Sequence, residues 1–291
     1  MSIEHDGPVI CSKDGLRVID CRSCGYAHLD PLPTQADLDA FWEAFYSSDG
    51  YKYEQEERDL WYWRRVWDER MREFERLTLT PPPSLRVMLD FGAGLGQFIR
   101  HITYDFSVLW AALGYDPNFN GPGVSRGIYT VKGALARYDA VNCSLVLEHV
   151  LDPLATLSVI HKLLIPGGVL CLIVPNEFNP LQQQLRRYGY SPIHLTHVNY
   201  FTPATLMRLV DEAGFEIIRR TATFPIEWFA LHGLNYVTHP RLGRLAHVLR
   251  MWFESALLTC APETKRRLYE RFAQKGIGRE VELWARKTFQ A

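Results

Sequence analysis

Residues 87–96, Val-Met-Leu-Asp-Phe-Gly-Ala-Gly-Leu-Gly, decide the fold of this chain. The stretch begins as a short apolar run and breaks into three closely spaced glycines, which predicts a buried parallel strand followed by a tight turn. Residues 97–103 read as the opening of a helix, whose free N–H groups attract a carboxylate or a phosphate. An acidic residue, Asp116, follows the last glycine by twenty positions. Together these features predict the nucleotide-cofactor pocket of an α/β protein.

The glycine spacing bears on which cofactor this turn binds. A dinucleotide-binding turn has the pattern Gly-x-Gly-x-x-Gly. Gly92 and Gly94 fit that pattern, but Gln97 stands where the third glycine belongs, and Gly96 comes one residue early. The spacing therefore weakens a nicotinamide-dependent oxidoreductase as an interpretation without excluding it.

Three segments resemble motifs of the class I S-adenosylmethionine-dependent methyltransferases. Residues 89–96, Leu-Asp-Phe-Gly-Ala-Gly-Leu-Gly, resemble the first motif of that family, and residues 138–147, Tyr-Asp-Ala-Val-Asn-Cys-Ser-Leu-Val-Leu, resemble its fourth strand. Residues 148–153, Glu-His-Val-Leu-Asp-Pro, resemble the turn that follows that strand. The resemblance covers roughly residues 85–220. It implies an α/β, Rossmann-like, seven-stranded mixed sheet with helices on both faces, and S-adenosylmethionine as the cofactor.

The resemblance also implies which residues contact the cofactor. Asp90 and the glycine turn would hold its methionine end, and Asp116 would accept hydrogen bonds from its ribose. Relatives often have an acidic residue after the third strand that accepts the adenine amino group, whereas residues 131–135 here, Val-Lys-Gly-Ala-Leu, offer none. We expect backbone groups to substitute there. The predicted cofactor contacts are Asp90, Gly92, Ala93, Gly94, Gly96, Asp116, Pro117, Asn118, Ala134, Leu135, Ser144, Leu145 and His149.

Candidate catalytic residues cluster in residues 192–202, Pro-Ile-His-Leu-Thr-His-Val-Asn-Tyr-Phe-Thr. This connection runs over the ligand-binding edge of an open α/β sheet, and histidine has a pKa suited to accepting a proton near neutral pH. Relatives have a similar stretch whose histidine faces the acceptor. We therefore predict His197 as the general base, with His194 and Tyr200 as supporting contacts. The alternative is that the two histidines brace the loop. A metal held by His149, His194 and His197 is conceivable, although their spacing does not demand it.

A Cys-x-x-Cys pair, Cys21 and Cys24, follows Cys11 by ten residues. The segment through residue 33 resembles the zinc-ribbon leader of a subset of sugar and natural-product methyltransferases. Tetrahedral zinc needs four ligands, but Pro8 stands where such leaders have a further cysteine. We therefore predict a zinc site of Cys11, Cys21 and Cys24 completed by His5 or His28. The alternative is a relic segment that keeps its fold without metal.

Proline runs divide the chain into three predicted parts. Residues 1–33 form the cysteine-bearing N-terminal segment, residues 34–80 a helical lid or linker, and residues 81–291 the methyltransferase domain. Apolar residues at helical spacing predict a helical insertion at about residues 225–278, before the last strand. Its aromatic side chains are expected to roof an acceptor pocket, with core packing or dimerisation as the alternative: Trp228, Phe229, His232, Tyr236 and Trp252.

Composition narrows the function. The 291 residues are 47% hydrophobic with a formal net charge of -1, so the positive field of a nucleic-acid-binding protein is absent. We predict a cytoplasmic enzyme with no membrane partner, because the sequence shows neither an apolar run of roughly 20 residues nor a secretory signal. The acceptor is expected to be a small molecule, methylated at a hydroxyl or carbon of a sugar, nucleotide sugar or natural product. A homodimer is left open, and the alternative from another class is a catalytically silent, methyltransferase-like binding subunit.

Overall fold

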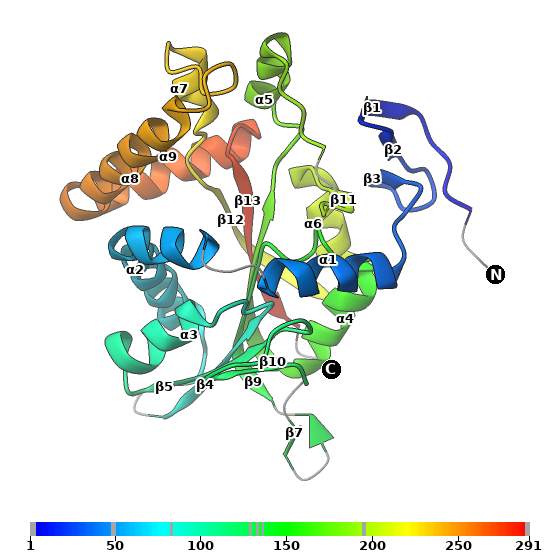
Figure 1. Ribbon diagram of the computed structural model, residues 1–291. Coiled ribbons are helices and arrows are strands. Elements are labelled where there is room, and N and C mark those ends of the chain that lie inside the picture. The colour runs from blue at the N-terminus through cyan, green and yellow to red at the C-terminus, as the bar shows by residue number, and fades with distance from the viewer. Residues whose placement is uncertain are drawn as a thin grey trace.

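The structure is a computed structural model that describes residues 4–47, 51–81, 84–127, 130–131, 134–135, 137–193 and 196–288. A seven-stranded mixed sheet lies at its centre, with the order β12-β13-β10-β9-β4-β5-β6 (Figure 1). The strands from β10 to β6 run parallel, and β13 runs antiparallel to both β10 and β12. The strands of this sheet are β4 (Arg86–Phe91), β5 (Trp110–Tyr115), β6 (Val124–Ser125), β9 (Tyr138–Ser144), β10 (Leu164–Pro175), β12 (Phe215–Ala222) and β13 (Glu280–Lys287).

Helices cover both faces of the sheet, as predicted. On one face, α4 (Pro153–Leu163) and α6 (Pro203–Glu212) pack against the central strands through fully buried leucine and isoleucine side chains. On the other face, α2 (Tyr51–Leu77) and α3 (Gln97–His101) pack through Phe74 and Phe98. Because the central strands are covered on both sides, β9 and β10 are almost wholly buried, which explains their continuous apolar sequence. The Rossmann-like fold predicted from the sequence is confirmed.

The helix predicted over residues 97–103 is shorter than expected. It is regular only over α3 and continues as one π-helical stretch, η1 (Ile102–Phe106). Between β5 and β9 the described residues contain β6 and a two-stranded sheet of β7 (Thr130–Val131) and β8 (Ala134–Leu135), with no helix in the parts of residues 116–137 that can be described. Several glycines in this segment disfavour a helix.

The N-terminal segment forms a second, four-stranded sheet of order β1-β2-β3-β11. Its first three strands are β1 (Val9–Lys13), β2 (Leu16–Asp20) and β3 (Ala27–Asp30). Its last strand, β11 (Asn199–Tyr200), comes from the histidine-bearing loop before α6. Figure 1 shows this sheet beside α6, while α1 (Gln35–Ser47) crosses in front of the central sheet. The pairing of β3 with β11 therefore ties the N-terminal segment to the loop that carries His197.

The predicted helical insertion lies between β12 and β13. It contains α7 (Glu227–Leu231), α8 (Leu242–Cys260) and α9 (Pro262–Lys275), and α8 and α9 lie on the same side of the sheet as α2 (Figure 1). A short helix α5 (Pro180–Leu185) and a 3-10 turn η2 (Arg186–Tyr188) follow β10. Of the helices whose residues can be described, none combines the length and the apolar character needed to cross a membrane.

Candidate active site

A cavity of about 1170 Å³ opens at the carboxyl ends of the parallel strands. The residues that follow β4, β5, β9 and β10 all contribute to its wall, because parallel strands end at one edge of a sheet. Helices α1 and α2 complete the wall from outside the sheet. Among the lining residues are Trp42, Tyr46, Trp63, Trp67, Arg70, Asp90, Gly92, Gly94, Asp116, Asn118, Ser144, Leu145, Glu148, His149, Glu177, His197, His247, Arg279 and Glu280.

The glycine turn forms one wall of this cavity. Gly92, Gly94 and Gly96 have positive φ angles of 79°, 52° and 74°. Residues other than glycine rarely adopt such angles. At Gly92 an added Cβ atom would also lie 2.3 Å from Cγ2 of Val146, so the close approach of β4 and β9 requires glycine there. The backbone N–H of Gly92 donates to the carbonyl of Tyr115 at 2.7 Å, which fixes the turn to the end of β5. The turn thus presents backbone to the cavity.

Asp116 lies at the centre of the predicted cofactor contacts. Its carboxylate accepts hydrogen bonds from the N–H of Gly94 at 2.9 Å and from the N–H of Asn118 at 3.0 Å. The hydroxyl of Tyr46, on α1, donates to the same carboxylate at 3.4 Å. The carboxylate is therefore held between the glycine turn and the covering helix. Tyr46 was not predicted from the sequence, because only the folded chain brings α1 over the turn.

Burial in the fold destabilises the charged form of Asp90. Its side chain is buried, and it accepts a hydrogen bond from Nδ2 of Asn142 at 2.6 Å. Burial raises the pKa of Asp90 to about 6, although the hydrogen bond from Asn142 and the nearby guanidinium of Arg70 oppose that rise. A cationic group bound in the cavity would stabilise the charged form.

The residues after β9 form the floor of the cavity. Ser144 ends the strand, and Leu145 adopts a positive φ of 59° while its N–H donates to Ile173 at 2.8 Å. A left-handed leucine is unusual, and such strain is characteristic of binding sites. His149 lies in the cavity wall as predicted: its Nδ1 is 2.7 Å from the carbonyl oxygen of Thr196, and its ring meets that of Trp42 edge-on at 5.0 Å.

His197 lies at the cavity and is paired with a buried carboxylate. Its Nδ1 is 2.7 Å from Oε1 of Glu177, whose side chain is only 5% exposed. The ring centroid of His149 is 5.0 Å from that of His197. Glu177 was missed from the sequence, although its place directly after β10, at the carboxyl edge of the sheet, is a signal that could have found it.

Tyr200, one of the two predicted catalytic supports, is not among the residues that line the cavity. It is 2% exposed in β11, and its ring packs 5.5 Å from that of Phe178 in the core of the N-terminal sheet. The other support, His194, lies outside the described residues, and the catalytic role of both stays a prediction. Ala134 and Leu135 form β8, in a sheet separate from the central one, and their contact with adenine stays a prediction.

The carboxyl group of Glu148 is a further unpredicted feature. Its side chain is 1% exposed, burial raises its pKa well above the ordinary value, and neither of its oxygens has a hydrogen-bond partner among the described residues. The ligand atoms of Glu148, His149 and His197 all lie within 4.8 Å of one another. This group differs from the histidine trio considered from the sequence, and it is the set that could hold a metal at the cavity.

The helical insertion contributes less to the cavity wall than its aromatic residues led us to expect. None of the five aromatic residues expected from the insertion is among the lining residues of the described chain. Trp252 is 66% exposed beside Trp61, and Trp228 stacks on His232 at the surface. Helix α2 supplies flat surfaces instead, and α8 contributes one imidazole. The side chains in this part of the cavity wall are Asp59, Trp63, Trp67, Arg70, His247, Arg279 and Glu280.

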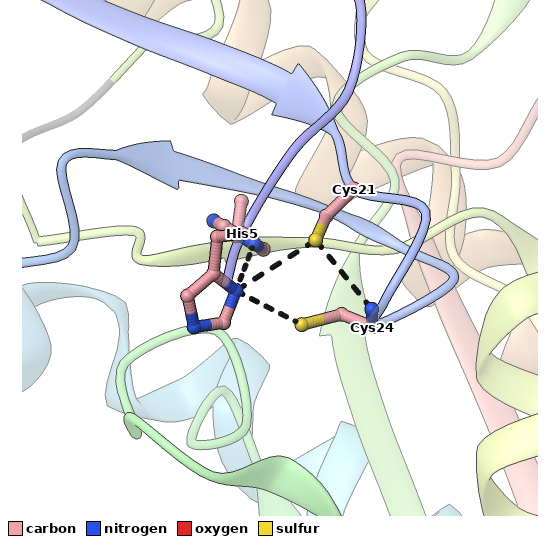
Figure 2. A group of neighbouring side chains, drawn as sticks. His5, Cys21 and Cys24 are labelled. Carbon is pink, nitrogen blue, oxygen red and sulfur yellow. Dashed lines mark hydrogen bonds between the residues drawn. The ribbon is translucent and has the colours of Figure 1, made fainter. Parts of the chain in front are cut away.

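The predicted N-terminal ligands are only partly brought together. Cys21 and Cys24 lie beside His5, as Figure 2 shows, and His28 completes a group whose ligand atoms lie within 4.8 Å of one another. Cys11 is not in this group. It pairs with Val18 across the β1–β2 ladder and packs in the small core of the N-terminal sheet. The predicted set of three cysteines is therefore corrected to two cysteines and two histidines.

Comparisons with known proteins show which family the chain resembles. The profile of the family described as "Methyltransferase domain" matches residues 60–220. A ubiquinone biosynthesis O-methyltransferase from Psychrobacter arcticus is 36% identical over 86 residues, which are 27% of this chain and 33% of that relative. The chain thus matches about a third of the length of this curated relative.

One solved structure shares the fold at low sequence identity, and a second is less similar. One chain from the complex between the Haloferax volcanii Trm112 methyltransferase activator and a methyltransferase has a TM-score of 0.51 and 16% identity, with 88% of this chain and 100% of that chain covered. A SAM-dependent methyltransferase from Archaeoglobus fulgidus has a TM-score of 0.45 and 17% identity, with 82% and 100% covered.

The fold and the cavity define a Rossmann-like enzyme of the methyltransferase class. Because the family profile matches more than half of its length, the chain belongs to the methyltransferase domain family. The class predicted from the glycine turn is confirmed. The sugar or natural-product subtype stays a prediction.

Proposed function

We propose that the chain transfers the methyl group of S-adenosylmethionine to a hydroxyl group of a small-molecule acceptor, with His197 as the general base. The observation that carries this proposal is the hydrogen-bonded pair of His197 and Glu177 at the wall of the cavity that also holds the glycine turn and Asp116. A cofactor site and an acid–base pair thus share one enclosed space.

Charge favours a sulfonium cofactor over a diphosphate. Asp90 and Asp116 both line the cavity, and the negative charge of Asp116 raises the pKa of Asp90. Asp90 lies just before the glycine turn, where its charge repels a pyrophosphate and attracts the ammonium group of S-adenosylmethionine. Asp116 suits the ribose of either cofactor. The charge of Asp90 and the glycine spacing therefore oppose the nicotinamide alternative.

The pairing of His197 fixes which of its nitrogens can act as a base. When the carboxylate of Glu177 accepts the proton on Nδ1, the neutral imidazole carries its lone pair on Nε2. In the transfer, a lone pair of the acceptor oxygen attacks the methyl carbon, and the bond from that carbon to sulfur breaks. Its electron pair stays on sulfur, giving S-adenosylhomocysteine, while the hydroxyl proton passes to Nε2 of His197.

The side chains that α2 brings to the cavity indicate which kind of acceptor the chain binds. Trp63 and Trp67 both line the cavity, and such flat surfaces suit a sugar ring or a planar natural product. Arg70 and Arg279 line it as well. Arg279 is paired with the buried Glu227 at 2.6 Å, so Arg70 is the cation that a negatively charged nucleotide sugar would meet first.

Binding and turnover measurements test this function. Calorimetry should show that S-adenosylmethionine binds and that NADH does not. Transfer of a labelled methyl group should then be measured with a panel of sugars, nucleotide sugars and phenolic compounds. His197→Ala should lower turnover about 10²-fold while leaving cofactor affinity unchanged, as expected for loss of an acid–base group.

A control histidine and a chelator separate the remaining explanations. His232→Ala changes an imidazole that stacks on Trp228 at the surface, so its turnover should match that of the unaltered protein. Full activity of His197→Ala would move the role of the base elsewhere. If a chelator also stops turnover of a Cys24→Ser variant, in which the N-terminal group of cysteines and histidines is already broken, a metal held by Glu148, His149 and His197 replaces the general base. If no acceptor is methylated although the cofactor binds, the catalytically silent subunit is favoured.

A further inference from the structure

We propose that the N-terminal segment holds one structural zinc ion, bound by His5, Cys21, Cys24 and His28, and that this ion steadies the loop that carries His197. The ligand set differs from the three-cysteine set expected from the sequence. The metal site itself is independent of the methyl-transfer function, whereas its effect on the His197 loop rests on the function proposed above.

The donor atoms lie at distances close to those of a tetrahedral zinc cage. Nδ1 of His5 lies 3.1 Å from Nε2 of His28, 3.7 Å from Sγ of Cys21 and 3.4 Å from Sγ of Cys24, and all four atoms lie within 4.8 Å of one another. Zinc bonds of about 2.0 Å to nitrogen and about 2.3 Å to sulfur place tetrahedral donors roughly 3.3 to 3.8 Å apart. The three distances from His5 therefore differ from those of a zinc site only by tenths of an ångström.

Hydrogen bonding alone does not account for this convergence. A single ring nitrogen has either one proton or one lone pair, yet Nδ1 of His5 faces one nitrogen and two sulfur atoms at once (Figure 2). A cation at the centre would accept all four lone pairs together. Two thiolates and two neutral imidazoles would also cancel the charge of Zn²⁺, which matters because Cys21 and His28 are each only 1% exposed.

The groups around the ligands orient them for a metal. Nδ1 of His28 lies 2.7 Å from the carbonyl oxygen of Leu29, so it carries the proton and leaves the lone pair on Nε2, which faces His5. The Cys21–Cys24 turn is closed by the N–H of Gly25, which donates to the carbonyl of Cys21 at 2.7 Å. The N–H of Cys24 points to Sγ of Cys21 at 3.5 Å, as a donor to a thiolate would.

The site is joined directly to the catalytic loop. His28 pairs with Asn199 in the β3–β11 ladder, and the N–H of the next residue, Leu29, donates to the carbonyl of Val198 at 2.9 Å. Val198 follows His197 in the chain, and its own N–H donates to the carbonyl of Glu148 at 2.6 Å. Loss of the ion would free His28 and loosen this ladder. The glycine turn, at the other end of the cavity, makes none of these hydrogen bonds.

Metal analysis of the full chain tests the site. Protein purified without chelator should contain one zinc ion per chain, and Co²⁺ added to chelator-treated protein should give a thiolate-to-cobalt charge-transfer band. Cys24→Ser and His28→Gln should each lower the zinc content at least 10-fold, whereas Cys11→Ser should keep it. If the variants fail to fold, chelator removal and Co²⁺ return on the unaltered chain still decide the point.

Two results would overturn the site: an unaltered chain that neither contains zinc nor binds Co²⁺, or a Cys11→Ser variant as depleted of zinc as Cys24→Ser.

Amide hydrogen exchange tests the coupling between the zinc site and the loop that carries His197. Chelation should speed exchange at Val198 and Asn199 while leaving the glycine turn unchanged. Unchanged exchange at Val198 would refute the coupling. Because these readouts need no turnover, they stand apart from any failure to detect methyl transfer.

Discussion

The substitution Asp90→Asn is expected to stabilise the free protein and to weaken cofactor binding. Burial raises the pKa of Asp90 from 3.8 to about 6, so the folded state holds a proton that the unfolded chain has already lost between these two pH values. The stability of the native protein therefore falls as the pH rises through this window. Asparagine keeps the oxygen that accepts the hydrogen bond from Asn142 and carries no charge, so the variant escapes this loss.

The size of the effect follows from the pKa shift. The pKa of Asp90 rises from 3.8 to about 6. Each pKa unit corresponds to about 1.36 kcal/mol, so above pH 6 the charged carboxylate lowers the free energy of unfolding by about 3 kcal/mol. The same relation gives about half of that cost near pH 5. The stability difference between the variant and the unaltered protein should therefore roughly double between pH 5 and pH 8.

Urea denaturation of the cofactor-free proteins at several pH values measures this difference. The low-pH data serve as an internal control, because the two proteins converge where both carry a neutral side chain. Calorimetry at pH 8 should then show cofactor affinity lowered by about 1.5 to 3 kcal/mol, through the loss of a charged partner for the ammonium group. A pH-independent stability difference, or a variant less stable than the unaltered protein at pH 8, would refute the reasoning.

Three further predictions concern the same cavity. Asp116→Ala should weaken S-adenosylmethionine binding by about 1 to 3 kcal/mol, measured by calorimetry, because charged hydrogen bonds to the ribose are lost; equal affinity would remove Asp116 from the ribose site. Glu177→Gln keeps an acceptor for His197 but not its charge, so turnover should fall about 10-fold or more with little change in cofactor affinity; a change in affinity alone would contradict the pairing. Gly92→Ala should destabilise the fold by about 2 kcal/mol or more in urea denaturation, because of its positive φ and the contact with Val146; the control Gly127→Ala, where an added Cβ meets nothing closer than 3.9 Å, should be nearly neutral.

The part of the cavity wall at the edge of the sheet could largely be predicted from the sequence. The glycine turn, Asp116, Ser144 and Leu145 all line the cavity, because each lies at or just after the end of a parallel strand and the ends of such strands meet at one edge. Their contact with a cofactor stays a prediction. The covering residues were not readable. Trp42 and Tyr46 come from a helix before the sheet, and no local pattern specifies which part of the sheet such a helix crosses.

The rest of the cavity wall was predicted less well, for a related reason. The aromatic residues of the insertion have the composition of a binding surface, yet those of α2 form the wall instead. Composition indicates that a side chain can contact a ring, but the packing of α2 and α8 on the sheet decides which side chains face inward. Only His247 of the insertion's helix α8 reaches the cavity among the described residues.

By itself, the sequence determined the strand, turn and helix around residues 87–101 and the order of the elements that follow, because apolar periodicity and glycine act over a few neighbouring residues. Tertiary structure alone decided that His197 meets Glu177, and that His28 and not Cys11 joins Cys21 and Cys24. The group of cysteines and histidines depends on the register of the N-terminal sheet, where a shift of one residue turns every side chain to the opposite face. The contact of His197 with Glu177 depends on how the loop before α6 lies beside the end of β10.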